Sequence, residues 1–147
     1  MRFMIIVKAT KDSEAEVMPI GPAWEPIFAE MAKYHEELQR AGVLLDGSGL
    51  QPSSKGWRIK YSGGKRTVID GPFTEAKELV AGYTLIQVKS KDEAIAWLKR
   101  APFEDGYEVE IRQVFEADDF GPALTPEIRE REERLRAEAS ARAKKGR

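Results

Sequence analysis

Short runs of apolar residues, separated by polar turns, recur along the chain up to about residue 115. Short runs that are continuously apolar, or that alternate apolar with polar residues, are typical of β-strands. Strands are therefore predicted at residues 2–9, 43–49, 57–61, 67–69, 84–88 and 107–115. Between the third and fourth of these, Ser62-Gly63-Gly64-Lys65 predicts a tight hairpin turn.

Two segments instead carry the spacing of helices. The first begins near Pro26 and ends at Gly42, and its predicted buried stripe is Ile27, Met31, Tyr34, Leu38 and Ala41. The second begins at Ser90, which with Glu93 forms a capping box, and turns Ile95, Leu98 and Ala101 inward. A polar loop is expected at 11–21. The predicted order is β-α-β, an inserted hairpin with a short helical turn, then β-α-β.

The composition of the chain changes after Phe115, from alternating apolar and polar runs to a sequence rich in charged residues. Residues 118–122 resemble a linker, and Thr125-Pro126 begins a highly charged helix that runs to about Lys145. Its only large aliphatic residues are Ile128 and Leu135, which offer little apolar surface for packing against another helix. We therefore expect this helix to extend into solvent. We expect residues 1–116 to form one domain and residues 117–147 to form a linker and charged tail.

Composition narrows the class of protein. The 147 residues are 41% hydrophobic and 33% charged, as in an ordinary globular domain. The absence of cysteine excludes disulfides, a thiol nucleophile and zinc–thiolate sites. No apolar run approaches the length of a membrane span, and the N-terminus lacks the features of a signal peptide. A cytoplasmic protein without membrane contact is expected.

The net charge of −1 hides an asymmetry. From Glu127 onward there are eight basic and five acidic residues, which leaves the preceding body at −4. An acidic body argues against a broad nucleic-acid surface, so no nucleic-acid partner is expected. No cofactor or metal is expected either, because the chain has one histidine, no recognisable metal-ligand spacing and no phosphate-binding glycine loop.

The densest group of charged and turn-forming residues is the 70–83 segment, Asp70-Gly71-Pro72-Phe73-Thr74-Glu75-Ala76-Lys77-Glu78-Leu79-Val80-Ala81-Gly82-Tyr83. It joins two strands that are expected to be buried, so it is either a structural corner or a site. Asp70 is the first candidate for catalysis, as a general acid or base if burial raises its pKa. The alternative is that Asp70 only accepts hydrogen bonds from amides of the turn.

The rest of this segment supplies candidate ligand-binding residues: Gly71, Pro72, Phe73, Glu75, Lys77, Glu78 and Tyr83. The charged members would line a cleft for a polar ligand, or form the solvated face of a short helix. The Tyr83 hydroxyl would orient a substrate, or its ring would serve packing. His35 is the second catalytic candidate because its unperturbed pKa lies near neutrality, although a lone helical histidine is more often a surface or packed residue.

Six motifs in a fixed order resemble the YCII-related family, whose signature is DGPF. They are the strand at 2–7, Glu37-Leu38 with Ala41-Gly42, Gly47-x-Gly49-Leu50-x-Pro52, Asp70-Gly71-Pro72-Phe73, Glu93-Ala94-x-x-Trp97, and Glu110-x-Arg112-x-Val114. The resemblance implies a ferredoxin-like α+β fold of the dimeric α/β-barrel type. The expected sheet is antiparallel, with two main helices, the inserted hairpin and the C-terminal charged helix.

The resemblance also implies function. A homodimer with its sheets face to face would form a pocket for a small polar molecule near the DGPF residues. In the wider family a helical histidine is proposed to work with an aspartate, but that position falls nearer Met31 than His35, about one turn away. The alternative function is a regulatory accessory of an alternative sigma factor, which would contact its protein partner through the tail.

Overall fold

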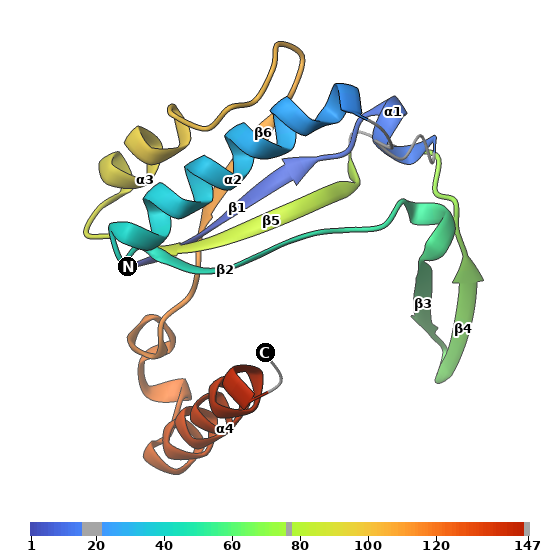
Figure 1. Cartoon of the computed structure of the whole chain (residues 1–147). Coiled ribbons are helices and arrows are strands. Elements are labelled where there is room, and N and C mark those ends of the chain that lie inside the picture. The colour runs from blue at the N-terminus through green and yellow to red at the C-terminus, as the bar shows by residue number, and fades with distance from the viewer. Residues whose placement is uncertain (16–21, 76–77, 146–147) are drawn as a thin grey trace. The chain divides into compact units, whose positions relative to one another are not determined.

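The computed structural model describes residues 1–15, 22–75 and 78–145 (Figure 1). It divides the chain into two compact units, Met1–Val114 and Phe115–Arg147. The first unit contains the sheet, its two main helices and the hairpin, and the second contains the C-terminal helix. Each unit is described separately below.

A four-stranded antiparallel sheet forms the first unit. Its order is β2 (Leu44–Gly49), β5 (Val80–Gln87), β1 (Arg2–Lys8), β6 (Val109–Gln113). Helix α2 (Glu25–Arg40) connects β1 to β2, and α3 (Lys91–Leu98) connects β5 to β6. A βαββαβ order with the first and third of these strands in the centre is the ferredoxin-like arrangement. The predicted fold class is therefore confirmed.

The two helices pack on one face of this sheet (Figure 1). Phe3 and Ile86 are cross-strand partners, and their side chains lie in the same buried cluster. The other fully or nearly buried members of the cluster are Ile5, Tyr34, Leu38, Val43, Val88 and Ala94. The central part of the predicted helical stripe is therefore buried, whereas Ile27 at its start and Ala41 at its end are exposed.

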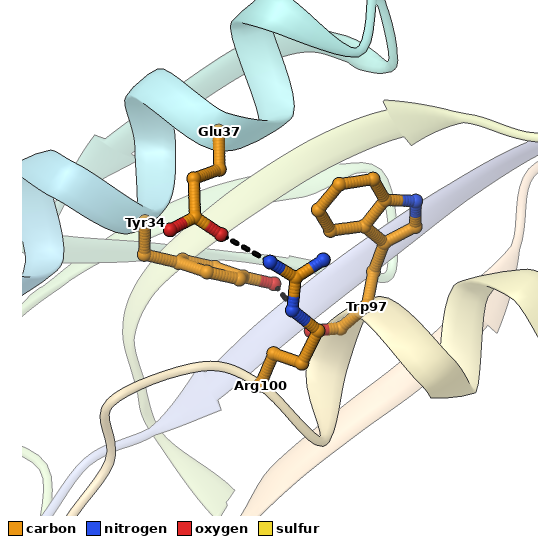
Figure 2. Close-up of polar contacts among 4 residues, drawn as sticks. All are labelled: Tyr34, Glu37, Trp97 and Arg100. Carbon is orange, nitrogen blue, oxygen red and sulfur yellow. Dashed lines mark hydrogen bonds and ion pairs between the residues drawn. The ribbon is translucent and has the colours of Figure 1, made fainter.

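Polar contacts join α2 to α3 at the edge of the core (Figure 2). The Tyr34 hydroxyl donates to the Trp97 carbonyl oxygen at 3.0 Å. Burial raises the pKa of Tyr34 from 10 to about 12, against the opposing influence of Arg100. Arg100 forms an ion pair with Glu37, and its guanidinium lies 4.7 Å from the centre of the Trp97 ring. The hydroxyl is thus a neutral donor that holds the two helices together.

The inserted hairpin is a separate two-stranded sheet, formed by β3 (Trp57–Ser62) and β4 (Lys65–Asp70). Its turn residues Gly63 and Gly64 have φ of 56° and 75°, as the predicted tight turn requires. Every residue of both strands is exposed. The expectation that the strand before Asp70 is buried is therefore wrong, because β4 pairs with β3 alone and contributes nothing to the core.

The expected polar loop at 11–21 also differs from the structure. Residues Lys11–Glu14 form a short helix, α1, which begins with a capping box between Thr10 and Ser13. The hydroxyl of Thr10 accepts from the Ser13 amide, and the hydroxyl of Ser13 accepts from the Thr10 amide. Such reciprocal caps are usually recognised by Glu or Gln at the second position, and serine at that position is a weaker signal of a helix start. Residues 16–21 lie outside the described part of the chain.

The second unit consists of a 3-10 helix, η4 (Ala117–Ala123), followed by α4 (Pro126–Lys145). Residues 118–122, expected to be a linker, lie in η4 and contact α4 through the ion pair of Asp118 with Arg129 at 2.7 Å. Ile128 and Leu135 on α4 are about half exposed. Within the described residues, no helix has the length and apolar character needed to cross a membrane.

Removing residues from Asp118 onward should leave the first unit folded. All residues of the buried cluster lie before position 112, so the truncation removes none of the core. We expect a cooperative thermal transition and an unchanged near-ultraviolet circular dichroism spectrum in the region of the aromatic residues of the first unit. An insoluble or non-cooperative truncated protein would show that the second unit is needed for folding.

Candidate functional site

The first half of the 70–83 segment is fastened to the turn that precedes the hairpin. The Gly71 amide donates to the Gly56 carbonyl oxygen at 3.0 Å, and the Phe73 amide donates to the Ser53 hydroxyl at 3.0 Å. The guanidinium of Arg58 lies 3.8 Å from the centre of the Phe73 ring, a cation–π contact. Both ends of the hairpin are therefore joined at one point.

Backbone crowding at this point requires glycine at position 71. A Cβ atom there would lie 1.8 Å from the Ser53 carbonyl oxygen and 2.7 Å from its carbonyl carbon. No rotamer change relieves such a collision, because both atoms belong to the backbone. The glycine of the DGPF sequence thus allows two backbone segments to touch.

Glu14, which the sequence analysis missed, completes this arrangement. Its carboxylate accepts from the Ser53 amide at 3.1 and 3.2 Å and from the Ser53 hydroxyl at 2.5 Å. Ser53 is the first residue of the short 3-10 helix η2 (Ser53–Lys55), so Glu14 caps η2 from α1. The pairing spans 39 positions, and neither residue lies in a motif that identifies its partner. We call Glu14, Ser53, Gly56, Gly71 and Phe73 the hairpin anchor.

Several predicted site residues lie outside these contacts. Asp70 is exposed at the end of β4, opposite Trp57, and its carboxylate makes no hydrogen bond or ion pair with the residues that the structure describes. Pro72, Glu75 and Glu78 are also exposed. Lys77 lies outside the described residues. The candidate roles of these residues in catalysis or ligand binding therefore stay predictions.

His35 is placed apart from Asp70. It lies on α2, half-buried, with its ring centre 5.9 Å from that of Tyr34, whereas Asp70 belongs to the separate hairpin sheet. Burial lowers the pKa of His35 below 6.5, which favours the neutral imidazole. Among the described contacts, none joins His35 to Asp70.

Tyr83 lies on the sheet face opposite the helices. Its hydroxyl donates to Asp46 Oδ2 at 3.2 Å, and it is the cross-strand partner of Ile6. The neighbouring cross-strand pair on this face is Met4 with Leu85. We call the face that carries these residues the open face, because α2 and α3 cover the other one.

A polar cavity of about 260 Å³ lies at the end of the sheet where the 70–83 segment rejoins it. It is lined by Lys8, Ala9, Thr10, Gly106 and Glu108. The Ala9 amide donates to the Leu79 carbonyl oxygen at 2.9 Å, which ties the cavity wall to the segment. The Lys8 ammonium pairs with Glu110 at 3.1 Å. Among the described residues no group of three His, Asp or Glu side chains is arranged to hold a metal ion.

The backbone contact at Gly71 predicts a large cost for an added methyl group. Gly71→Ala should lower the free energy of unfolding by about 2–4 kcal/mol, because the anchor must separate to admit Cβ. Two controls should stay within about 0.5 kcal/mol of the original: Gly49→Ala, where Cβ meets nothing within 4 Å, and the neighbouring exposed Asp70→Ala. Urea titrations measure all three. Equal stability of Gly71→Ala and Gly49→Ala would contradict the anchor.

The model of the YCII-related domain matches residues 1–118. An uncharacterized protein of Rhizobium meliloti (strain 1021) is 32% identical over 71 residues, which are 48% of this chain and 57% of that protein. The matched region therefore spans little more than half the length of that relative.

A solved structure of 5-chloro-2-hydroxyhydroquinone dehydrochlorinase from Burkholderia phenoliruptrix AC1100, in complex with 2,5-dihydroxybenzoquinone, aligns with a TM-score of 0.39 and 16% identity. The alignment covers 79% of this chain and 96% of that one. The family match, in contrast, includes the whole sheet, both main helices and the DGPF residues, and the chain belongs to the family of the YCII-related domain.

Proposed function

We propose that this protein binds a small polar molecule in the cavity at the end of the sheet. The polar lining beside the 70–83 segment is the observation that carries the proposal. The volume of about 260 Å³ suits a molecule smaller than a typical drug. Lys8 has three N–H donors and uses one in its pair with Glu110, so it favours a ligand with an acceptor oxygen. Glu108 in the same lining and Glu110 beside Lys8 repel a carboxylate, so that oxygen is expected to belong to a neutral group.

Catalysis by Asp70, with Glu75 or His35 assisting, is a separate hypothesis. General acid–base catalysis needs groups within hydrogen-bond reach of one another or of a shared substrate. The described contacts bring no two of these three side chains together, so binding is the function that the geometry supports better. A ligand-bound structure with a proton-bearing group of the ligand within hydrogen-bond reach of Asp70 would revive the catalytic hypothesis.

The proposed assembly is a homodimer formed through the open face of the sheet. Met4, Ile6 and Leu85 give this face an apolar centre, and the pair of Tyr83 with Asp46 lies beside them. A central apolar patch with polar groups around it is the usual composition of a protein interface.

The alternative function, a regulatory accessory, draws support from the second unit. A cavity of about 250 Å³ there is lined by Phe120, Leu124, Ile128 and the charged residues of α4 among others. Apolar residues within a charged surface suit a protein partner. A pulldown with a purified alternative sigma factor tests this alternative.

The cavity proposal predicts a ligand-dependent gain in stability that requires Lys8. A screen of small neutral polyols, amides and hydroxy compounds by thermal shift should identify a compound that stabilises the protein, by about 2.7 kcal/mol at a hundred times its Kd. Lys8→Met should abolish the shift, because the acceptor oxygen loses its cationic donor. Lys99→Met, at an exposed position after α3, should retain it. A shift that survives in Lys8→Met would place the ligand elsewhere.

The dimer proposal predicts a particle of twice the 16.6 kDa chain mass in light scattering at micromolar concentration. Leu85→Glu should shift the particle toward the monomer, because the substitution puts a carboxylate at the apolar centre of the open face. Gln39→Glu, which adds the same charge at an exposed position of α2, should leave the mass unchanged. A compact monomer for the unmodified protein at this concentration would refute the homodimer.

A further inference from the structure

The hairpin, residues 57–70, carries a face for which the first unit provides no cover. On this face lie the cross-strand pairs Trp57 with Asp70, Ile59 with Val68 and Tyr61 with Arg66, whose guanidinium lies 4.5 Å from the centre of the Tyr61 ring. The exposed fractions are 70% for Trp57, 53% for Ile59, 67% for Tyr61 and 61% for Val68. We call these four residues the apolar face of the hairpin. An isolated two-stranded hairpin is marginally stable in water, so such a face is unfavourable unless another surface covers it.

The hairpin is nevertheless held in a defined position. The hairpin anchor fixes both of its ends, through the Gly71 amide on one strand end and Gly56 before the other. Arg58, on the opposite face of β3, stacks on Phe73 and so adds a side-chain contact at the base. Figure 1 shows β3 and β4 set apart from the four-stranded sheet. A hairpin whose base is already held in place loses little conformational entropy when it binds a partner.

Net charge favours a second copy of this chain as the occupant. Residues 57–70 contain four Lys or Arg and one Asp, a net charge of +3. Arg66 and Asp70 share the face with Trp57, whereas Arg58, Lys60 and Lys65 lie on the opposite face. The remainder of residues 1–114 contains twelve basic and sixteen acidic residues, a net charge of −4. The hairpin as a whole is thus opposite in net charge to the unit that carries it, which attracts the hairpin of one copy to the first unit of another without adding net charge to the apolar contact itself. The net charge of −4 on the rest of residues 1–114 disfavours a nucleic acid as the partner.

The available area suits the same partner. An aromatic side chain presents about 150–250 Å², so Trp57 and Tyr61 alone expose roughly 300 Å². A two-fold dimer buries two such hairpins together with the surfaces that receive them. A standard interface buries about 800 Å² per partner, and the hairpin contact would supply a substantial part of it.

We propose that the apolar face of the hairpin docks on the first unit of a second copy of this chain. The inference rests on the homodimer proposed above and adds a second contact to the open face. The hairpin then acts as an arm, and the hairpin anchor sets the direction in which the arm projects.

Photo-cross-linking tests the arm directly. Tyr61→p-benzoylphenylalanine should give a covalent dimer on irradiation of the purified full-length protein. Lys60→p-benzoylphenylalanine, on the opposite face of the same strand, should give at least fivefold less. A dimeric protein that gives no covalent dimer from position 61 would overturn the arm and leave the open-face dimer standing. A monomeric protein would overturn both.

Double substitutions test whether the apolar face contributes to the dimer, and a labelled oligonucleotide tests whether the hairpin binds nucleic acid instead. Ile59→Ser/Val68→Ser should raise the dimer dissociation constant at least tenfold in sedimentation equilibrium, whereas Lys60→Arg/Thr67→Ser on the other face should change it less than threefold. Equal dissociation constants would contradict the arm. Cross-linking of position 61 to a fluorescein-labelled single-stranded 20-mer, and to no second chain, would instead make the hairpin a nucleic-acid surface and refute the inference.

Discussion

Two backbone segments touch where the 70–83 segment passes the turn before the hairpin, and this contact holds the hairpin to the rest of the first unit. The space between position 71 and the Ser53 carbonyl group admits a hydrogen atom but not a methyl group. Ser53 in turn links the Glu14 carboxylate to the Phe73 amide. Three segments far apart in sequence are thereby joined through one serine.

This constraint explains why turn-forming and charged residues gather at one place in the sequence. The DGPF residues form a structural corner on the hairpin side, where Gly71 and Phe73 contact Ser53 and Gly56. On the other side the segment re-enters the sheet beside the polar cavity, through the bond from Ala9 to Leu79. The proposed ligand site and the proposed arm therefore lie at opposite ends of one connection, which suits a protein whose assembly and binding involve the same segment.

The sequence predicted the parts of the structure that depend on local pattern. The helical spacing of Tyr34 and Leu38 and the glycine pair at 63–64 each determine structure within a few residues, and these predictions are confirmed. The contact of Glu14 with Ser53 could not be predicted, because it depends on how α1 and η2 pack across 39 positions. The exposure of β4 was also missed, since Val68 and Ile69 look the same in sequence whether a second sheet covers them or solvent does.

Amide hydrogen exchange at Phe73, measured by NMR, tests the anchor most directly. Its amide donates to a side-chain hydroxyl rather than to a strand neighbour, so its protection reports on Ser53 alone. The anchor predicts slow exchange at Phe73 and at least tenfold faster exchange in Ser53→Ala, with the Ile86 amide of β5 unchanged. Exchange at Phe73 as fast as in an unstructured peptide, or equally slow in the variant, would contradict it.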